Sequence, residues 1–102
     1  MMARLVVRPA AEADIAAAAL WYEARASGLG AEFLRLVDVA LAEVQRMPER
    51  FPVVRAHCRR ALLRRFPYGI YFVPTAELIS VVACIHARRD PRRWEERVGS
   101  AL

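Results

Sequence analysis

The sequence contains no lysine, only two cysteines and no long hydrophobic run, and each shortage excludes a class of protein. Cys58 and Cys84 are too few for a disulfide framework, so we expect two free, partly buried thiols. The longest apolar run, 15–22, is well short of the ~20 residues that a membrane-spanning helix needs. Glu12 and Asp14 interrupt the segment that would be apolar in a secretory signal. These features predict a cytoplasmic protein.

Several common kinds of catalytic and metal site are also missing. The chain has no Gly-rich phosphate-binding loop, and none of its serines has a visible His/Asp arrangement. His57, Cys58, Cys84 and His86 could supply four zinc ligands. However, adjacent residues of an extended strand point to opposite faces, so His57 and Cys58 do not easily reach one ion. We therefore expect neither a metal nor a cofactor.

The charge of the chain is concentrated in its second half. The formal net charge is +5 and the isoelectric point is near 10.2. Residues 1–50 hold six arginines and seven acids, whereas residues 51–102 hold ten arginines and four acids. A basic half that faces outward favours an acidic partner, either nucleic acid or an acidic protein segment.

Proline and glycine mark the ends of two predicted helices. Pro9 suits the first helical position, where its missing N–H costs nothing, and Gly28 suits the break after the first helix. Pro48 ends the second helix. The two helices, 9–25 and 31–46, are joined by a short loop and should form an antiparallel hairpin. The buried faces are predicted to contain Ala11, Ile15, Ala18, Ala19 and Tyr22 on the first helix, and Phe33, Val37, Ala40, Leu41 and Val44 on the second.

Short runs of β-branched and aromatic residues predict four strands, at 3–7, 58–65, 69–73 and 78–86. The order of elements is therefore β-α-α-β-β-β. A length of 102 residues predicts one domain, 1–102. The expected fold class is α+β, with the helical hairpin packed on a small, mostly antiparallel sheet.

The last predicted strand has two largely apolar faces, and one is more apolar than the other. Strict alternation places Ile79, Val81, Ala83 and Ile85 on one face, and Leu78, Ser80, Val82, Cys84 and His86 on the other. The first face is the more apolar, so we expect it to pack on the helices. The second face is then expected to be partly open, as antiparallel sheets allow.

Eight arginines are the main candidates for function, because guanidinium groups match phosphates and carboxylates. They are Arg59, Arg60, Arg64, Arg65, Arg88, Arg89, Arg92 and Arg93. The alternative is a solvated surface with ion pairs to Asp90, Glu95 and Glu96.

Other side chains have a functional and a structural interpretation. His86 is either a general acid or base or a structural histidine at a strand end. Tyr68, Tyr71 and Phe72 either stack on bases or fill the core. Trp21 and Trp94 are expected to pack the first helix and the tail onto the body.

Six segments, in this order and spacing, resemble the RelE/ParE toxin superfamily of type II toxin–antitoxin modules, and more closely its ParE-like branch. They are RPAA at 8–11, WY at 21–22, GLG at 28–30, PERFP at 48–52, FPYGIYF at 66–72 and HARRDP at 86–91. The resemblance covers residues 3–97 and implies a toxin held inactive by a cognate antitoxin that wraps around it. ParE-type members poison DNA gyrase, whereas RelE-type members cleave mRNA on the ribosome.

Two differences favour the gyrase poison over the nuclease. Many mRNA-cleaving members carry an arginine where this chain has Gly69, and they end in a catalytic tyrosine that the segment 88–91 lacks. The preferred hypothesis is thus a non-enzymatic inhibitor of gyrase. The alternative is a ribosome-dependent endoribonuclease with a site rebuilt from Arg60, Arg65, His86 and Arg88.

Two binding surfaces follow from the resemblance together with the charge pattern. The target is expected to bind Arg59, Arg60, Arg64, Arg65, Arg88, Arg89 and Trp94. The antitoxin is expected to cover the helix hairpin and the sheet edge through Leu34, Val37, Leu41 and Tyr71.

Overall fold

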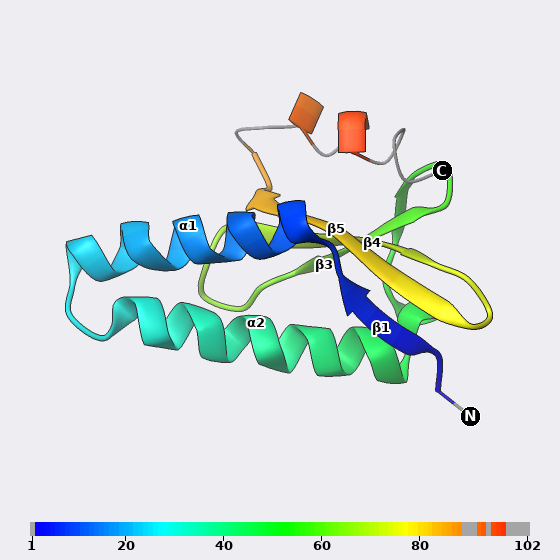
Figure 1. The fold of residues 1–102 in the computed structure, drawn as a ribbon, viewed down its shortest axis with the longest axis horizontal. Coiled ribbons are helices and arrows are strands. Elements are labelled where there is room, and N and C mark those ends of the chain that lie inside the picture. The colour runs from blue at the N-terminus through cyan, green and yellow to red at the C-terminus, as the bar shows by residue number, and fades with distance from the viewer. Residues whose placement is uncertain (1, 89–91, 94, 98–102) are drawn as a thin grey trace.

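A helical hairpin covers one face of a five-stranded sheet in the computed structural model, which describes residues 2–88, 92–93 and 95–97 (Figure 1). The helices are α1 (Pro9–Arg25) and α2 (Leu29–Arg46), and the strands are β1 (Arg4–Val7), β2 (Val53–Arg55), β3 (Cys58–Leu62), β4 (Tyr68–Pro74) and β5 (Leu78–His86). The sheet order is β1-β5-β4-β3-β2. All neighbours are antiparallel except β1 and β5, which are parallel. The predicted α+β fold class is confirmed.

The turn between the helices is closed by one carboxylate and two glycines. Gly28 has φ of 89°, the left-handed conformation that glycine tolerates best. The Glu23 carboxylate accepts hydrogen bonds from the amides of Gly28 and Gly30, each at 2.9 Å. A Cβ on Gly30 would lie 2.6 Å from the Ala19 carbonyl oxygen, so the missing side chain lets the helices approach closely.

Aromatic rings fill the space between the helices and the sheet. Tyr22 on α1 stacks on Phe33 of α2, with ring centroids 5.5 Å apart. The Phe66 ring packs edge to face against both, with its centroid 4.7 Å from that of Tyr22 and 5.2 Å from that of Phe33. Tyr68 joins the same group. The core predicted for the hairpin is therefore present, with Leu36 as a further buried residue of α2.

The connector between α2 and β3 is more ordered than the sequence predicted. It contains the short helix η1 (Pro48–Arg50) and the edge strand β2. At the other end, β3 stops at Leu62 and does not continue to residue 65, so this part of the strand prediction was wrong. The chain turns here because Arg65 takes a left-handed φ of 67°. The Leu63 amide donates a hydrogen bond to the Tyr68 carbonyl at 2.9 Å, which closes the turn.

A β-bulge in β5 overturns the predicted sidedness of that strand. Tyr71 pairs with Ala83 but Phe72 pairs with Val81, so Val82 is an extra residue. Ile79 and Val81 face the helices as expected. After the bulge the alternation is reversed: Cys84 joins the helix-facing core, whereas Ala83 and Ile85 join the outer face.

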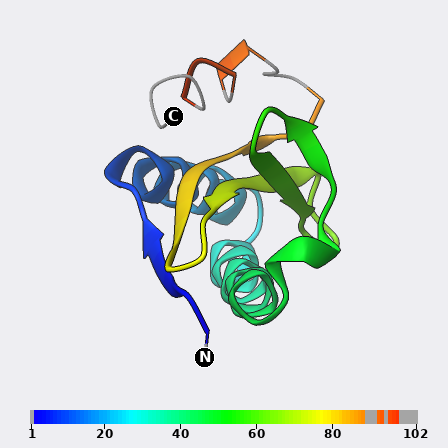
Figure 2. The same cartoon turned by 90° about the vertical axis from the view of Figure 1, so that its right-hand side faces the viewer.

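The outer face of the sheet is buried rather than partly open. Its cluster consists of Cys58, Tyr71, Val73, Val82, Ala83 and Ile85. The helical residues 92–93 and 95–97 lie on this side (Figure 2). Arg97 donates to the Val82 carbonyl at 3.3 Å, and Glu95 pairs with Arg55 of β2 at 2.7 Å. The chain after β5 therefore returns across the sheet. Within the described part of the chain, no helix is both long enough and apolar enough to cross a bilayer.

Candidate functional site

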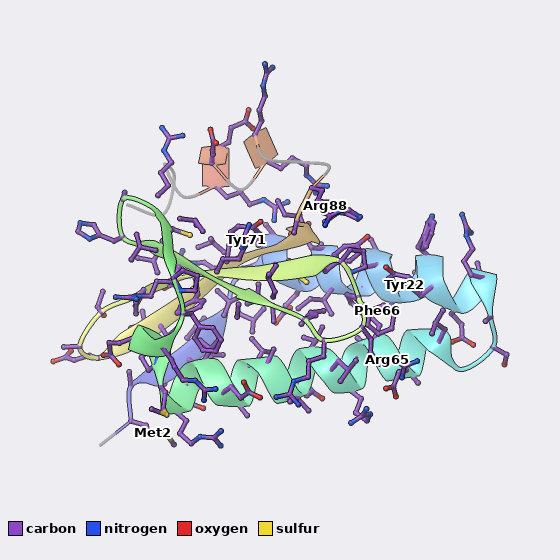
Figure 3. All side chains as sticks on the ribbon, turned by 180° about the vertical axis from the view of Figure 1, so that it is seen from behind. Met2, Tyr22, Arg65, Phe66, Tyr71 and Arg88 are labelled. Atoms are coloured by element: carbon purple, nitrogen blue, oxygen red, sulfur yellow. The ribbon has the colours of Figure 1, made fainter. Side chains whose placement is uncertain are left out.

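Arginines from two separate segments of the chain lie at one end of the sheet. Tyr68 and His86 are paired at the ends of β4 and β5, and the Ala87 amide donates to the Pro67 carbonyl at 2.9 Å. This contact brings the β3–β4 loop next to the residues that follow β5. Arg65 and Arg88 therefore lie at the same end of the sheet (Figure 3).

The two arginines of the β3–β4 loop also contact acids on α2. Arg65 pairs with Glu32 at 3.0 Å and Arg64 pairs with Glu43 at 3.5 Å. Glu32 also binds Arg35, and this guanidinium, with Arg65 as a smaller contribution, holds the pKa of the Glu32 carboxyl below its usual value. The Arg64 and Arg65 side chains remain 75% and 65% exposed, so a partner can still reach them. Exposed pairs of this kind contribute little to stability, because water screens the charges.

The neighbouring Arg59 and Arg60 are not brought together with that end. Arg59 faces the helix side, and its guanidinium donates to the carbonyls of Phe51 at 2.6 Å and Glu49 at 3.3 Å. It therefore holds the segment of η1 in place. Arg60 faces the outer side beside Tyr71. Adjacent strand residues point to opposite faces, so these two arginines of the predicted target surface lie on different faces of the sheet.

His86 and the aromatic residues of β4 have largely structural surroundings. The Nδ1 atom of His86 accepts a hydrogen bond from the Arg88 amide at 3.2 Å. The centroids of the His86 and Tyr68 rings are 5.6 Å apart. Tyr71 and Phe72 are fully buried. Their interpretation as core residues is therefore confirmed, and they do not form a stacking platform for bases.

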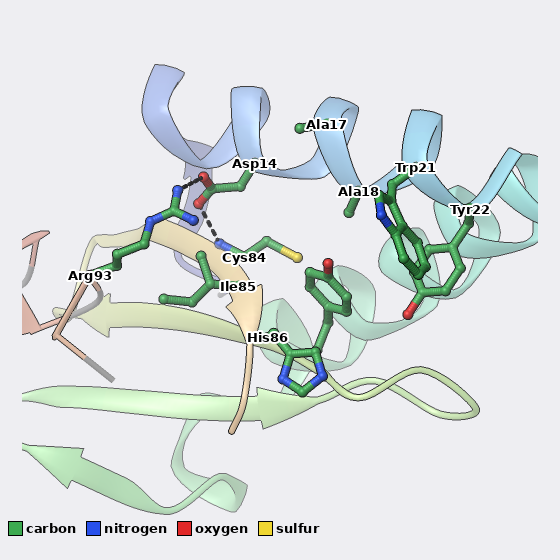
Figure 4. Close-up of a pocket in the computed structure, with 10 residues that line it drawn as sticks. Asp14, Ala17, Ala18, Trp21, Tyr22, Cys84, Ile85, His86 and Arg93 are labelled. Carbon is green, nitrogen blue, oxygen red and sulfur yellow. Dashed lines mark hydrogen bonds and ion pairs between the residues drawn. The ribbon is translucent and has the colours of Figure 1, made fainter. Parts of the chain in front are cut away.

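Asp14 forms the centre of a buried ionic cluster that was not predicted from the sequence. This carboxylate on α1 has only 5% of its side chain exposed. It accepts hydrogen bonds from the Cys84 amide at 3.0 Å and from the Arg93 guanidinium at 3.1 Å (Figure 4). It also accepts hydrogen bonds from both terminal nitrogens of Arg97. The hydrogen bond to Asp14 raises the pKa of Arg97. The predicted buried face of the first helix does not include Asp14, although Ala11 and Ala18, spaced three and four residues from it, place it on that face.

A pocket of about 280 Å³ opens between α1 and the end of β5 (Figure 4). We call it the ring pocket. Its walls include Ala17, Trp21, Tyr22, Tyr68, Ile85 and His86. The ion pair of Asp14 and Arg93 forms one end. Arg25 lies over the Trp21 ring, with its guanidinium carbon 3.8 Å from the ring centre.

A second cavity, of about 500 Å³, lies between the helices, and we call it the helix groove. Its walls include Ile15, Ala16, Leu20, Leu34, Val37 and Leu41. Leu20 is 72% exposed and Leu34 is 44% exposed. Three of the four residues predicted to bind the antitoxin thus share one groove. Tyr71 does not line the groove: it is 0% exposed and lies on the outer face of the sheet.

The comparisons with known proteins find a match in structure but not in sequence. No protein-family model matches the chain, and no curated protein does. One similar solved chain is from the chromosomal ParDE TA system of P. aeruginosa. It shares 17% sequence identity with this chain and has a TM-score of 0.73, over 85% of this chain and 98% of its own length. This chain has a ParE/RelE-like fold.

Within this ParE/RelE-like fold, Gly69 lies against the side chain of Arg60. A Cβ at this position would lie 3.1 Å from Cγ and Cδ of Arg60. The Arg60 stem would therefore have to shift by a few tenths of an ångström to admit a side chain at 69. Burial raises the pKa of the adjacent Tyr71 hydroxyl, and the Arg60 guanidinium offsets this in part.

Two residues of the predicted target surface, Arg89 and Trp94, lie outside the described residues. The remaining five are divided among the helix side, the outer face and the loop end of this ParE/RelE-like chain. Across residues 2–88, 92–93 and 95–97, no three side chains of His, Cys, Asp or Glu gather where they could hold a metal ion.

Proposed function

We propose that this chain is the toxin of a type II toxin–antitoxin pair, neutralised by a cognate antitoxin. The observation that carries the proposal is the shared fold, which extends over 98% of one chain of the ParDE TA system. A fold alone does not determine an activity. The proposal therefore also depends on an accessible surface for an antitoxin and on one for a target.

The helix groove supports the antitoxin part of the proposal. Leu34, Val37 and Leu41 recur on one face of α2, at the spacing that receives an amphipathic helix. Glu12 and Asp38 also line the groove, so a basic residue of the incoming helix has partners at its rim. The groove is the surface through which we propose that the antitoxin binds.

For the target, we propose DNA gyrase, inhibited through protein contacts rather than by a chemical step. The support is that the arginines of β3 do not converge with His86: Arg59 holds η1, and Arg60 lies on the outer face over Gly69. The exposed arginines Arg64, Arg65 and Arg88 would then contact an acidic surface of the enzyme or the DNA that it holds.

One observation favours the second candidate, a ribosome-dependent endoribonuclease. Arg65, His86 and Arg88 lie at one end of the sheet, because the Ala87–Pro67 contact joins their segments. A histidine near cationic side chains can transfer a proton and stabilise a phosphate in a transition state. On this hypothesis these three residues, with Arg60, form the catalytic site.

Induced expression without antitoxin distinguishes the two targets. We expect DNA synthesis, followed by pulse labelling, to fall before protein synthesis, and plasmid DNA to become relaxed or linear. An earlier fall in protein synthesis, with mRNA cut within codons, would replace gyrase by the ribosome. The absence of growth arrest would contradict the toxin assignment itself.

A further inference from the structure

The ring pocket is a second candidate binding site, on the opposite side of α1 from the helix groove. Ala16 lines the groove and Ala17 lines the pocket, although they are successive residues of one helix. We propose that the ring pocket receives one aromatic side chain of the antitoxin, from a segment in which that side chain stands beside an acidic residue. This inference rests on the toxin–antitoxin function proposed above.

The size of the pocket fits one side chain. Its volume of about 280 Å³ is just below the ~300–1,000 Å³ of pockets that hold drug-sized ligands. A phenyl or indole group buries ~150–250 Å² and is a frequent anchor of protein interfaces. Trp21 and Tyr22 are themselves arranged edge to face at 5.0 Å, and an incoming ring can extend this arrangement.

Part of the pocket wall is apolar, and this part suits the ring of a protein side chain better than a nucleobase. Ala17, Ala18 and Ile85 present only hydrocarbon. Cys84 presents a neutral thiol, because burial raises its pKa to about 12. A base would bring ring nitrogens and exocyclic groups into this space, and each would need a hydrogen-bond partner. A phenyl ring needs none.

The end of the pocket carries positive charge. Two guanidinium groups, from Arg93 and Arg97, share the single carboxylate of Asp14. The Arg93 side chain is 51% exposed, and Arg88, just beyond His86, is also exposed. A carboxylate next to the bound ring would therefore meet an excess of cations. This charge complementarity is the reason for an acidic neighbour in the proposed segment.

The test uses the full chain and a defined peptide, acetyl-Glu-Phe-Glu-amide, in a titration followed by amide NMR shifts. We expect saturable shifts at Ala17, Cys84 and Ile85. The peptides acetyl-Glu-Ala-Glu-amide and acetyl-Lys-Phe-Lys-amide should bind at least about tenfold more weakly, because one lacks the ring and the other has the wrong charge.

Exposed positions of α1 provide matched variants. Ala17→Leu fills the pocket and should weaken peptide binding at least about tenfold. Ala16→Leu, which fills the groove, and Ala13→Leu, which lines neither cavity, should leave it unchanged. Trp21→Ala removes a wall of the pocket and provides a second loss variant. Thermal melting of each variant checks that the chain is folded.

Three results would overturn the proposal: shifts confined to Leu34 and Leu41, equal affinity in Ala17→Leu and Ala16→Leu, or tighter binding of adenosine monophosphate than of the peptide. The last result would assign the pocket to a nucleobase. The titration needs no antitoxin, so its failure leaves the toxin assignment standing. Conversely, absence of growth arrest on expression would remove the toxin assignment without affecting the peptide result.

Discussion

Asp14 connects three distant parts of the chain through one carboxylate. It lies on α1, accepts the amide of Cys84 on β5, and binds Arg93 and Arg97 of the segment that crosses the outer face. A buried anion is tolerated only when it is paired and hydrogen-bonded, and each of these contacts meets that need. Asp14 is therefore a structural residue whose loss affects the outer face of the sheet.

Replacing Asp14 with asparagine should destabilise the protein. The variant keeps the volume but removes the charge, so two guanidinium groups lose their anion. We expect the free energy of unfolding to fall by about 1–3 kcal/mol, below the ~3–5 kcal/mol typical of fully buried pairs, because the Arg93 side chain is 51% exposed and water screens it.

Urea denaturation of Asp14→Asn measures this loss, with Glu12→Gln as the control. Glu12 is an exposed acid on the same helix, and its replacement should change the unfolding midpoint very little. If the two variants unfold at the same urea concentration, the ionic cluster does not stabilise the fold.

At the scale of secondary structure, the helical hairpin depends on the turn that joins α1 to α2. The Glu23 carboxylate accepts hydrogen bonds from the amides of Gly28 and Gly30. These hydrogen bonds lower the pKa of the carboxyl, and the bond from Gly28 has the larger effect. The proton is therefore bound more weakly in the folded than in the unfolded chain. Stability gained from this turn is present above the ordinary pKa of glutamate and is lost as the pH falls through the lowered folded value.

Glu23→Gln should remove this pH-dependent contribution. We expect the variant to be less stable than the wild type at about pH 7, and the difference to disappear well below about pH 4, the ordinary pKa of glutamate. Denaturation curves across this range measure the effect. Glu77→Gln, at an exposed acid of the β4–β5 turn, should show no such trend, and a pH-independent difference for Glu23→Gln would contradict the assignment.

The sequence predicted the helices and the order of the main strands because local chemistry decides them. Pro9 and Gly28 mark ends, and the 3.6-residue period of α2 has no competing interpretation. The bulge at Val82 was not predictable from alternation, since both faces of β5 are apolar and a one-residue insertion leaves no trace in such a run. The edge strand β2 is only three residues long and was not among the four predicted strands.

The candidate site was predicted less well than the fold, because it depends on long-range contacts. Arg65 and Arg88 lie at the same end of the sheet because of the Ala87–Pro67 contact, which no local pattern encodes. That Arg59 and Arg60 face opposite sides, in contrast, follows from strand geometry and could have been stated from the sequence. Asp14 was missed because an acid early in a helix has an ordinary explanation in the helix dipole.

For the whole molecule, α1 has a cavity on each side: the helix groove toward α2 and the ring pocket toward the end of β5. On the function proposed above, an antitoxin that wraps around the chain can occupy both. The exposed arginines of the β3–β4 loop are outside the groove. Neutralisation by the antitoxin and action on the target should therefore be separable by mutation.

Leu34→Glu should produce a toxin that its antitoxin no longer neutralises. Leu34 is 44% exposed and lines the groove, so a charge there changes the partner surface without disturbing the core. We expect affinity for the antitoxin to fall at least about tenfold and growth arrest to persist when both proteins are expressed. Ala24→Glu adds the same charge outside the groove and should still be neutralised. Rescue of both variants alike would place the antitoxin elsewhere.

The pairing of β1 with β5 sets the point in synthesis at which the sheet can close. β1 (Arg4–Val7) is made before β5 (Leu78–His86), its only neighbour in the sheet order, and Asp14 on α1 is made before Arg97. At ~5–20 residues per second, synthesis of residues 4–86 takes about 4–17 s. Until then β1 has no partner in the sheet. On the toxin function proposed above, a nascent chain would therefore be inactive until β5 has been made.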